Sequence, residues 1–266
     1  MIKALTLAAL LALPALHAPA ATQDDVLSAT ILPGWRTGAG SHMAALHLSL
    51  APSWKTYWRS PGDAGIPPEF NWSGSQNVKS VRVLWPSPSV FHSNGMRTIG
   101  YHDAVVLPLE VVPIDPSKPV QLKAQVDMGV CKDICVPAQI DVQGLLGGIG
   151  QKSGAISAAL HELPQEARAA GVGKISCSVS PVSDGLRLTA SMVLAVQGAE
   201  ETVVFEARDR SIWVSEAETS RSGNVLTASA DFVASGGAAF ALDRSGVTVT
   251  VLHEGGSVEI KGCPAP

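Results

Sequence analysis

Apolar and polar residues alternate on both sides of a short turn near the middle of the chain. Apolar residues occupy every second position from Val120 to Met128, and a similar alternation resumes from Val136 to Val142. A period of two is typical of a strand with one buried face. The pattern therefore predicts a β-hairpin over residues 120–142, in which residues 129–135 reverse the chain.

The predicted turn carries two cysteines, Cys131 and Cys135, with three residues between them. At such a turn the two β-carbons can approach to the roughly 4 Å that a disulfide requires. So short a loop gains little stability from closure, and exposed disulfides are the labile ones, so the pair favours thiol–disulfide interchange. Two alternatives stay open: a local clip on the hairpin, and half of a zinc site, although no second Cys/His pair at ligand spacing follows.

The first residues are typical of a secretory signal peptide. An apolar run over residues 4–13 is followed by a small-x-small site over residues 18–20, so we expect residues 1–20 to be removed after Ala20. Export places the cysteines in an oxidising compartment, which we expect to be the periplasm. No later stretch has 18 consecutive apolar residues, so we expect no membrane span in the mature chain.

Composition narrows the classes of partner and fold. The 266 residues carry a formal net charge of −4 and no basic block, which argues against nucleic acid as a partner. Charged residues make up 16% of the chain, and there are 25 glycines and 18 prolines. This composition suits an all-β protein with many turns.

The alternating segments fall into two groups on either side of a helical pattern. Residues 21–143 predict a first β-sandwich, and residues 174–266 predict seven or eight short strands of a second. Between them, a period of 3.6 over residues 153–170 predicts a helix that Pro164 kinks or divides. We therefore interpret residues 144–173 as a linker with a helix.

The other two cysteines lie near the ends of the predicted second sandwich, Cys177 on its first strand and Cys263 just past its last. Four cysteines allow three connectivities. We predict the one that pairs Cys177 with Cys263, because it joins the two ends of one domain across a long loop, worth roughly 4 kcal/mol in the chain-entropy model. We interpret this pair as a structural disulfide.

Two stretches of the first half interrupt the strands and carry further candidate residues. Residues 60–68 are rich in proline and glycine, which break a sheet ladder, and they hold Asp63, which either caps its own turn or supports a site. Residues 86–101 predict a long loop that holds Phe91. A long loop with an aromatic residue is often functional, and the alternative is that Phe91 plugs the end of the core.

Four segments, in this order, resemble the amino-terminal periplasmic domain of the DsbD and ScsB thiol:disulfide interchange proteins, and ScsB more closely. They are WKTYWRSPGDAGIPPEFNW, LWPSPSVF, GYHDAVVLPLEV and GVCKDICVPAQ, between positions 54 and 139. The connector and the second half fit the two-domain soluble region of ScsB-like proteins. The resemblance therefore covers most of the mature chain.

The resemblance implies an all-β fold of two immunoglobulin-like β-sandwich domains joined by a short helical connector. It also implies that Cys135 forms a mixed disulfide with a partner and that Cys131 resolves it, with Phe91 shielding the pair and Tyr101 and Asp63 supporting it. The residues themselves do not choose between the cysteines, because the neighbouring Lys132 and Asp133 act on a thiolate in opposite directions.

Two departures from the DsbD pattern limit what the resemblance implies. DsbD has a longer cysteine spacing than this chain, so its site geometry does not transfer in detail. The sequence also holds neither the membrane helices nor the thioredoxin-like C-x-x-C domain of that protein. We therefore expect a separate membrane electron donor, or a role as an oxidant.

The leading hypothesis is a periplasmic thiol:disulfide oxidoreductase that relays electrons through Cys131 and Cys135, without a cofactor or metal. Its expected partners are periplasmic thioredoxin-like or Dsb/Scs-type redox proteins. The alternative is a non-enzymatic module of the cell envelope, either an adaptor or a copper-binding protein that uses the two cysteines and Met128, because soft sulfur ligands suit Cu(I). No nucleophile-elbow motif supports a hydrolase.

Overall fold

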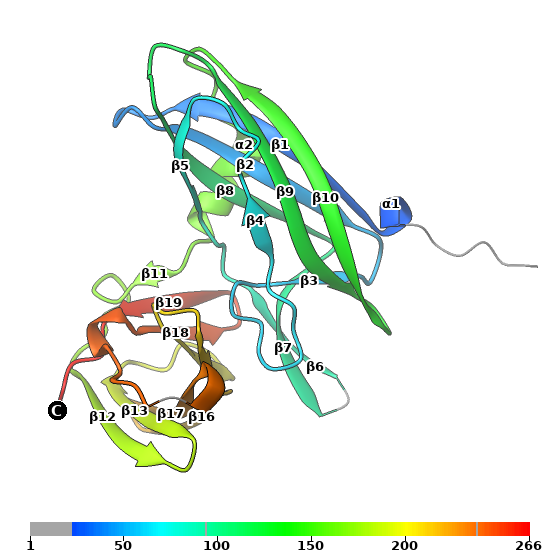
Figure 1. Ribbon diagram of the computed structural model, residues 1–266. Coiled ribbons are helices and arrows are strands. Elements are labelled where there is room, and N and C mark those ends of the chain that lie inside the picture. The colour runs from blue at the N-terminus through cyan, green and yellow to red at the C-terminus, as the bar shows by residue number, and fades with distance from the viewer. Residues whose placement is uncertain (1–22, 94, 238) are drawn as a thin grey trace, which may run out of the picture.

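The computed structural model describes residues 23–93, 95–237 and 239–266. The predicted signal peptide, residues 1–20, lies outside the described residues. Within those three ranges, no helix is long and apolar enough to cross a membrane. Most elements are strands, and they group around two hydrophobic cores (Figure 1). The prediction of an all-β fold with immunoglobulin-like sandwiches is confirmed.

The first core lies between two antiparallel sheets. One has the strand order β1-β2-β8-β5. The other, called the cysteine sheet below, has the order β10-β9-β3-β7-β6, and β4 also pairs with β9. A short helix α1 (Gln23–Val26) precedes β1. The strands are β1 (Leu27–Arg36), β2 (His42–Leu50), β3 (Lys55–Tyr57), β4 (Glu69–Asn71), β5 (Val78–Val83), β6 (Ser89–Ser93), β7 (Met96–His102), β8 (Ala104–Pro113), β9 (Val120–Cys131) and β10 (Cys135–Leu146).

Strand β9 follows the predicted alternation over most of its length. Side chains from Val120 to Met128 are alternately buried and more exposed, because every second one points into the core. There they pack with residues such as Leu46 and Leu109 of the facing sheet. At Gly129, Val130 and Cys131 the alternation ends, and all three residues are buried. The outer face of the cysteine sheet must therefore be covered at this end.

The prediction of a long loop over residues 86–101 is wrong, because most of this stretch forms the β6–β7 hairpin. Ser93 pairs with Met96, and Phe91 pairs with Thr98. The Asn94-Gly95 dipeptide is a strong sequence signal for a two-residue hairpin turn. The flanking strands alternate only weakly, so the turn residues carried the signal for this hairpin.

The second core lies between a sheet of order β11-β19-β18-β14 and a sheet of order β12-β13-β17-β15, with β16 also paired to β17. Phe205 and Phe232 are buried in it with their rings edge to face, 6.3 Å between centroids. The strands are β11 (Gln165–Glu166), β12 (Ile175–Val182), β13 (Gly185–Val193), β14 (Glu201–Glu206), β15 (Ile212–Val214), β16 (Glu218–Ser222), β17 (Val225–Ala234), β18 (Thr248–His253) and β19 (Gly256–Lys261). Two 3₁₀ turns, η1 (Ser235–Gly237) and η2 (Arg244–Gly246), precede β18.

The connector contains one helix, α2 (Gly154–His161), which is shorter than predicted. Ser153 caps its first turn, and the helix ends before Pro164. Proline disfavours a helical conformation in the preceding residue and lacks an N–H, so the periodic pattern beyond it did not become helix. The chain instead adds β11 to the second sandwich, parallel to β19.

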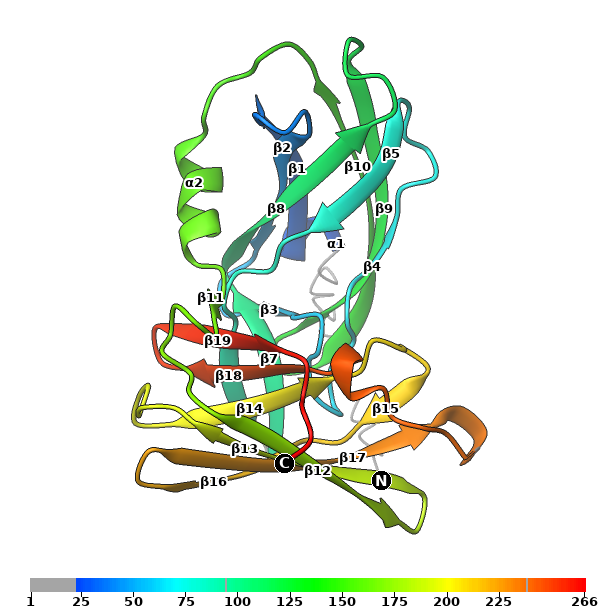
Figure 2. The same ribbon diagram turned by 90° about the vertical axis from the view of Figure 1, so that its left-hand side faces the viewer.

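The two sandwiches are in contact, and in both views the second lies below the first (Figures 1 and 2). Leu252 of β18, which is buried, packs with the first core rather than the second. The hydroxyl oxygens of Ser87 and Ser257 lie 2.7 Å apart across the same boundary. The second sandwich therefore contacts the first directly, as well as through the connector.

Candidate redox site

Strands β9 and β10 place the two cysteines at the tip of a long hairpin. Their register pairs Cys131 with Cys135 and continues through all twelve residues of each strand. The sulfurs are joined in a disulfide, with the two Cα atoms 4.1 Å apart. The three residues between them, including Ile134, are exposed. The sequence placed this pair at a turn, and the structure does the same.

The two residues of this disulfide differ in exposure. Residue Cys131 is 1% exposed, whereas Cys135 is exposed. Cys135 lies on β10, an edge strand, whereas β9, which carries Cys131, has neighbours on both sides. A thiolate that approaches from solvent therefore meets Cys135 first.

Both cysteines point to the outer face of the cysteine sheet. Cys131 is in phase with Lys123 and Asp127, which are exposed on that face, and not with the inward-facing Val126 and Met128. By alternation alone Cys131 would be exposed. Its burial therefore comes from residues that cover the outer face.

The residue that covers the pair is Tyr57, at the end of β3. Its hydroxyl oxygen lies 2.7 Å from the sulfur of Cys131 and 3.1 Å from that of Cys135. Disulfide sulfurs carry no hydrogen, so the phenol is the donor. Burial raises the pKa of the Tyr57 phenol above its ordinary value of about 10, which keeps the proton on the oxygen at neutral pH.

Three glycines fit closely around Tyr57, two of them against its ring and one against the backbone of β3. A β-carbon at Gly129 of β9 would lie 2.8 Å from Cε2 of the ring, and one at Gly65 would lie 3.0 Å from Cδ1. On the other neighbouring strand Gly100 pairs with Tyr57, and its β-carbon would lie 2.0 Å from the carbonyl oxygen of Thr56. The ring thus occupies a slot that side chains at positions 65 and 129 would close.

We expect Gly129→Ala to disturb the site. The added methyl group would lie within 3.0 Å of the Tyr57 ring and of Cβ of Ile66, so the ring must move and its hydroxyl must leave the sulfurs. Overpacking of this kind costs about 1–3 kcal/mol, which equilibrium urea unfolding measures. Gly38→Ala is the control, because Gly38 faces open space, and it should change stability by less than about 0.5 kcal/mol. Equal effects of the two substitutions would contradict the slot.

Phe91 lies on the same sheet but not against the disulfide. Its ring packs edge to face on His102, with the centroids 6.1 Å apart, and Nζ of Lys55 lies 4.9 Å from its centroid. Lys55 is the residue of β3 that pairs with Cys131. Strands β3 and β7 separate β6 from β9, so Phe91 covers the neighbour of Cys131. Shielding of the pair by Phe91 stays a prediction.

The other residues expected near the pair lie in different surroundings. Tyr101 is buried and donates a hydrogen bond to the carbonyl oxygen of Pro86 (2.7 Å). Asp63 is exposed in the loop of residues 60–68 and lines a cleft. Met128 is buried in the first core, where its sulfur accepts a hydrogen bond from Thr56 (3.7 Å).

The second disulfide joins Cys177 to Cys263, which are 86 positions apart in sequence and have their Cα atoms 5.5 Å apart. Both residues belong to the second core and are buried. The backbone N–H of Cys177 also donates to the carbonyl of Pro264. This disulfide ties the C-terminal end of the chain to β12 of the second sandwich.

Sequence reasoning missed Tyr57. In the segment WKTYW the alternation assigned Tyr57 to the face opposite Trp54, Thr56 and Trp58, but it could not show which strand would lie beside β3. The pairing of β3 with β9 joins residues more than seventy positions apart. The available signal was local: Gly129 stands two residues before Cys131 on the same face of β9, where a neighbouring ring could fit.

Comparison with known proteins identifies the first sandwich. Residues 28–146 match the family described as "Thiol:disulfide interchange protein DsbD, N-terminal". The match lies within the first sandwich and covers less than half of the chain. The resemblance predicted from the sequence motifs is therefore confirmed, and the DsbD N-terminal segment extends from β1 to the last residue of β10.

A solved structure shares the fold of nearly the whole chain. The N-terminal periplasmic domain of ScsB from Proteus mirabilis superposes with a TM-score of 0.66 at 23% sequence identity. The match covers 92% of this chain and 96% of that one, so it includes the second sandwich as well as the DsbD N-terminal segment. No curated protein matches the chain.

Proposed function

We propose that this protein is a periplasmic thiol:disulfide interchange protein that exchanges electrons with thioredoxin-like partners through Cys131 and Cys135. The observation that carries the proposal is the asymmetry of the disulfide. An exposed residue, Cys135, is bonded to a buried one, Cys131, and a phenol hydroxyl contacts both sulfurs, that of Cys131 more closely. The DsbD N-terminal family and the fold shared with a periplasmic ScsB domain support the same interpretation.

The geometry supports a definite order of steps. A partner thiolate attacks the sulfur of Cys135, the disulfide breaks, and its electron pair leaves on the sulfur of Cys131 as a thiolate. The hydroxyl of Tyr57 is in place to donate a hydrogen bond to this developing charge. The partner's second thiol then attacks the mixed disulfide and releases Cys135, so this protein gains two electrons and the partner is oxidised. In the reverse direction Cys135 attacks a partner disulfide and Cys131 resolves the intermediate.

Trapping tests the proposal. The probe is a thioredoxin variant that keeps only its nucleophilic cysteine, activated as a mixed disulfide with thionitrobenzoate. We expect Cys131→Ala, which leaves Cys135 free, to displace thionitrobenzoate and to form a covalent complex. Cys135→Ala is the matched control and should react at least about tenfold more slowly, because its remaining thiol is buried.

The reaction rates of the Cys131→Ala and Cys135→Ala variants distinguish a wrong assignment of the attacking cysteine from a wrong function. Equal rates for the two variants would contradict the assignment of Cys135 as the attacking residue. No complex from either variant, with the Cys177–Cys263 disulfide intact, would contradict the interchange function itself.

A further inference from the structure

The loop of residues 60–68, called the roof loop below, covers the slot that holds Tyr57. It connects β3 to β4 on the outer face of the cysteine sheet. Gly65 lies against one edge of the Tyr57 ring, and Ile66 lies over Gly129. In Figure 1 this loop is the cyan segment that begins at the end of β3, next to the β9–β10 hairpin. The roof loop and Tyr57 together therefore account for the burial of Gly129 and Cys131, which face outward on β9.

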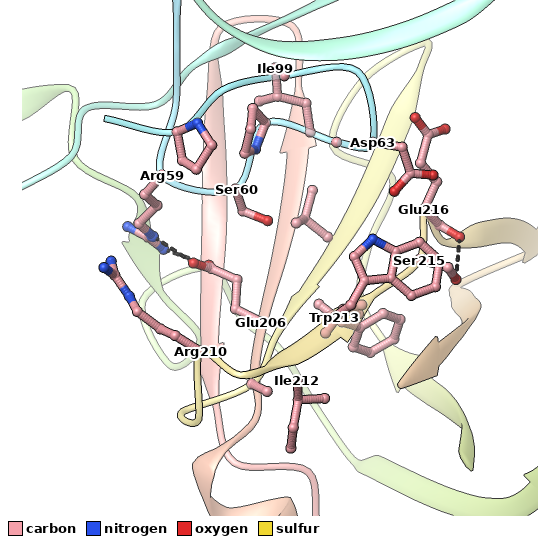
Figure 3. A pocket seen from close by; sticks show the side chains of 18 of the residues that line it. Arg59, Ser60, Asp63, Ile99, Glu206, Arg210, Ile212, Trp213, Ser215 and Glu216 are labelled. Atoms are coloured by element: carbon pink, nitrogen blue, oxygen red, sulfur yellow. Dashed lines mark hydrogen bonds and ion pairs between the residues drawn. The ribbon is translucent and has the colours of Figure 1, made fainter. Parts of the chain in front are cut away.

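The second sandwich holds Arg59, the residue just before the roof loop. Nε and Nη2 of Arg59 donate to the two carboxylate oxygens of Glu206 on β14, each at 2.9 Å. Nη2 also donates to Glu259 on β19, at 2.8 Å. The guanidinium packs over the ring of Trp58, 4.5 Å from its centroid. Figure 3 shows Arg59 directed at Glu206 across the cleft between the two sandwiches.

This anchor is largely withdrawn from solvent. The side chain of Arg59 is 18% exposed, and those of its two partners are about as covered. Burial by itself disfavours the charged guanidinium, but the hydrogen bonds and charges of Glu206 and Glu259 outweigh it and raise the pKa of Arg59. A bidentate, half-buried pair of this kind holds its geometry better than an exposed ion pair.

A second anchor between the two sandwiches lies beside Gly62 of the roof loop. Nη2 of Arg97 on β7 lies 3.2 Å from Oε2 of Glu216, which follows β15 in the second sandwich. Gly62 fits against this pair: its β-carbon would lie 3.0 Å from the carbonyl oxygen of Arg97 and 3.3 Å from Oε1 of Glu216. In Figure 3 Asp63 and Glu216 lie on the side of the cleft opposite Arg59.

We infer that Arg59 is a positioning residue of the redox site, through which the second sandwich holds the roof loop and keeps the Tyr57 hydroxyl on the sulfur of Cys131. Arg59 and Tyr57 are only two residues apart in the chain, so a shift of one is readily passed to the other. Tyr57 touches the sulfurs, Trp58 between is fully buried, and Arg59 is bound by the second sandwich. This inference rests on the proposed function. It assigns the second sandwich a role in that function, which is to position the redox site.

A double-mutant cycle tests the inference. All chains carry Cys135→Ala, so that Cys131 is the free thiol beside Tyr57. The thiolate-to-thiol ratio of Cys131 is followed by the ultraviolet absorbance of the thiolate during a pH titration. We expect Arg59→Gln to lower this ratio about fivefold at a given pH, because the hydroxyl no longer stays in place to stabilise the thiolate. In a Tyr57→Phe background the same substitution should change the ratio by less than about twofold, because the hydroxyl is already absent.

Controls separate positioning from general stability. Arg187→Gln removes a similar bidentate pair, with Asp231 within the second sandwich, and should leave the ratio unchanged. Arg59→Lys should recover part of the effect. Glu216→Gln, which loosens only the second anchor, gives a smaller change in the same direction and replaces Arg59→Gln if that variant does not fold.

Two results of the titration would overturn the inference. An unchanged ratio in both Arg59→Gln and Glu216→Gln overturns it. An equal effect of Arg59→Gln with Tyr57 present and in the Tyr57→Phe background also overturns it, because Arg59 would then act independently of the hydroxyl. The titration involves no redox partner. A failed trapping experiment with intact coupling would therefore reject the proposed function alone, and a successful trap without coupling would reject this inference alone.

Discussion

Replacing Cys177 and Cys263 together by alanine is expected to lower the free energy of unfolding by about 4 kcal/mol. The disulfide closes a loop of 86 positions, so its loss frees a long segment of the unfolded chain. Both residues are buried in the second core, and the two alanines leave a small cavity that adds to the effect. Equilibrium urea unfolding, followed by tryptophan fluorescence, measures the change.

The matched control is the double substitution of Cys131 and Cys135 by alanine. Their loop spans four positions, and the same entropy model then gives only about 2 kcal/mol. We expect the two variants to differ clearly in urea midpoint, and the slope to rise more on loss of the long Cys177–Cys263 loop, because that cross-link restrains more of the unfolded chain. A loss from the hairpin pair as large as that from the Cys177–Cys263 pair would favour the local-clip interpretation over interchange.

Tyr57→Phe is expected to slow reduction of the Cys131–Cys135 disulfide by dithiothreitol about tenfold. The substitution keeps the ring that fills the slot and removes the hydroxyl that contacts the sulfurs. A hydrogen bond to a charged group contributes about 1.5–3 kcal/mol, and about 1.4 kcal/mol corresponds to a factor of ten. The effect arises because the departing Cys131 thiolate loses its donor. Rapid acid quenching, alkylation and mass spectrometry of the peptides measure the rate.

Tyr101→Phe provides the control for this experiment. The protein has two tyrosines, and the hydroxyl of Tyr101 donates to the carbonyl of Pro86 instead of a sulfur. Its loss should reduce stability by about 1–3 kcal/mol, because a buried acceptor loses its partner, and should leave the reduction rate within about twofold. If both phenylalanine variants slow reduction equally, the contact of Tyr57 with the sulfurs does not contribute to the chemistry.

The redox site is assembled from three segments of the first sandwich and an anchor from the second. The cysteines come from one hairpin, the phenol from β3, and the roof loop from the following segment, which the second sandwich anchors through Arg59. The exposed residues Cys135 and Ile134 lie at the open side of this arrangement. A partner would thus approach the hairpin tip, and the leaving sulfur would stay inside the protein.

Local patterns in the sequence determined the all-β class, the cysteine hairpin and its turn. Alternation over residues 120–142 required no long-range information, because a strand with one buried face shows its period in its own side chains. The same local reasoning was less successful where propensity was weak, as in the β6–β7 hairpin, or where proline ended the periodic helix early.

Tertiary structure alone decided which side chains meet the disulfide. Alternation puts Cys131 on the outer face with Lys123 and Asp127, yet it is buried because Tyr57 and the roof loop cover that face. The contacts of Tyr57 with Cys131 and of Arg59 with Glu206 and Glu259 join positions 74, 147 and 200 residues apart. Such contacts depend on strand order and on the packing of two sandwiches, which no period or motif within one segment encodes.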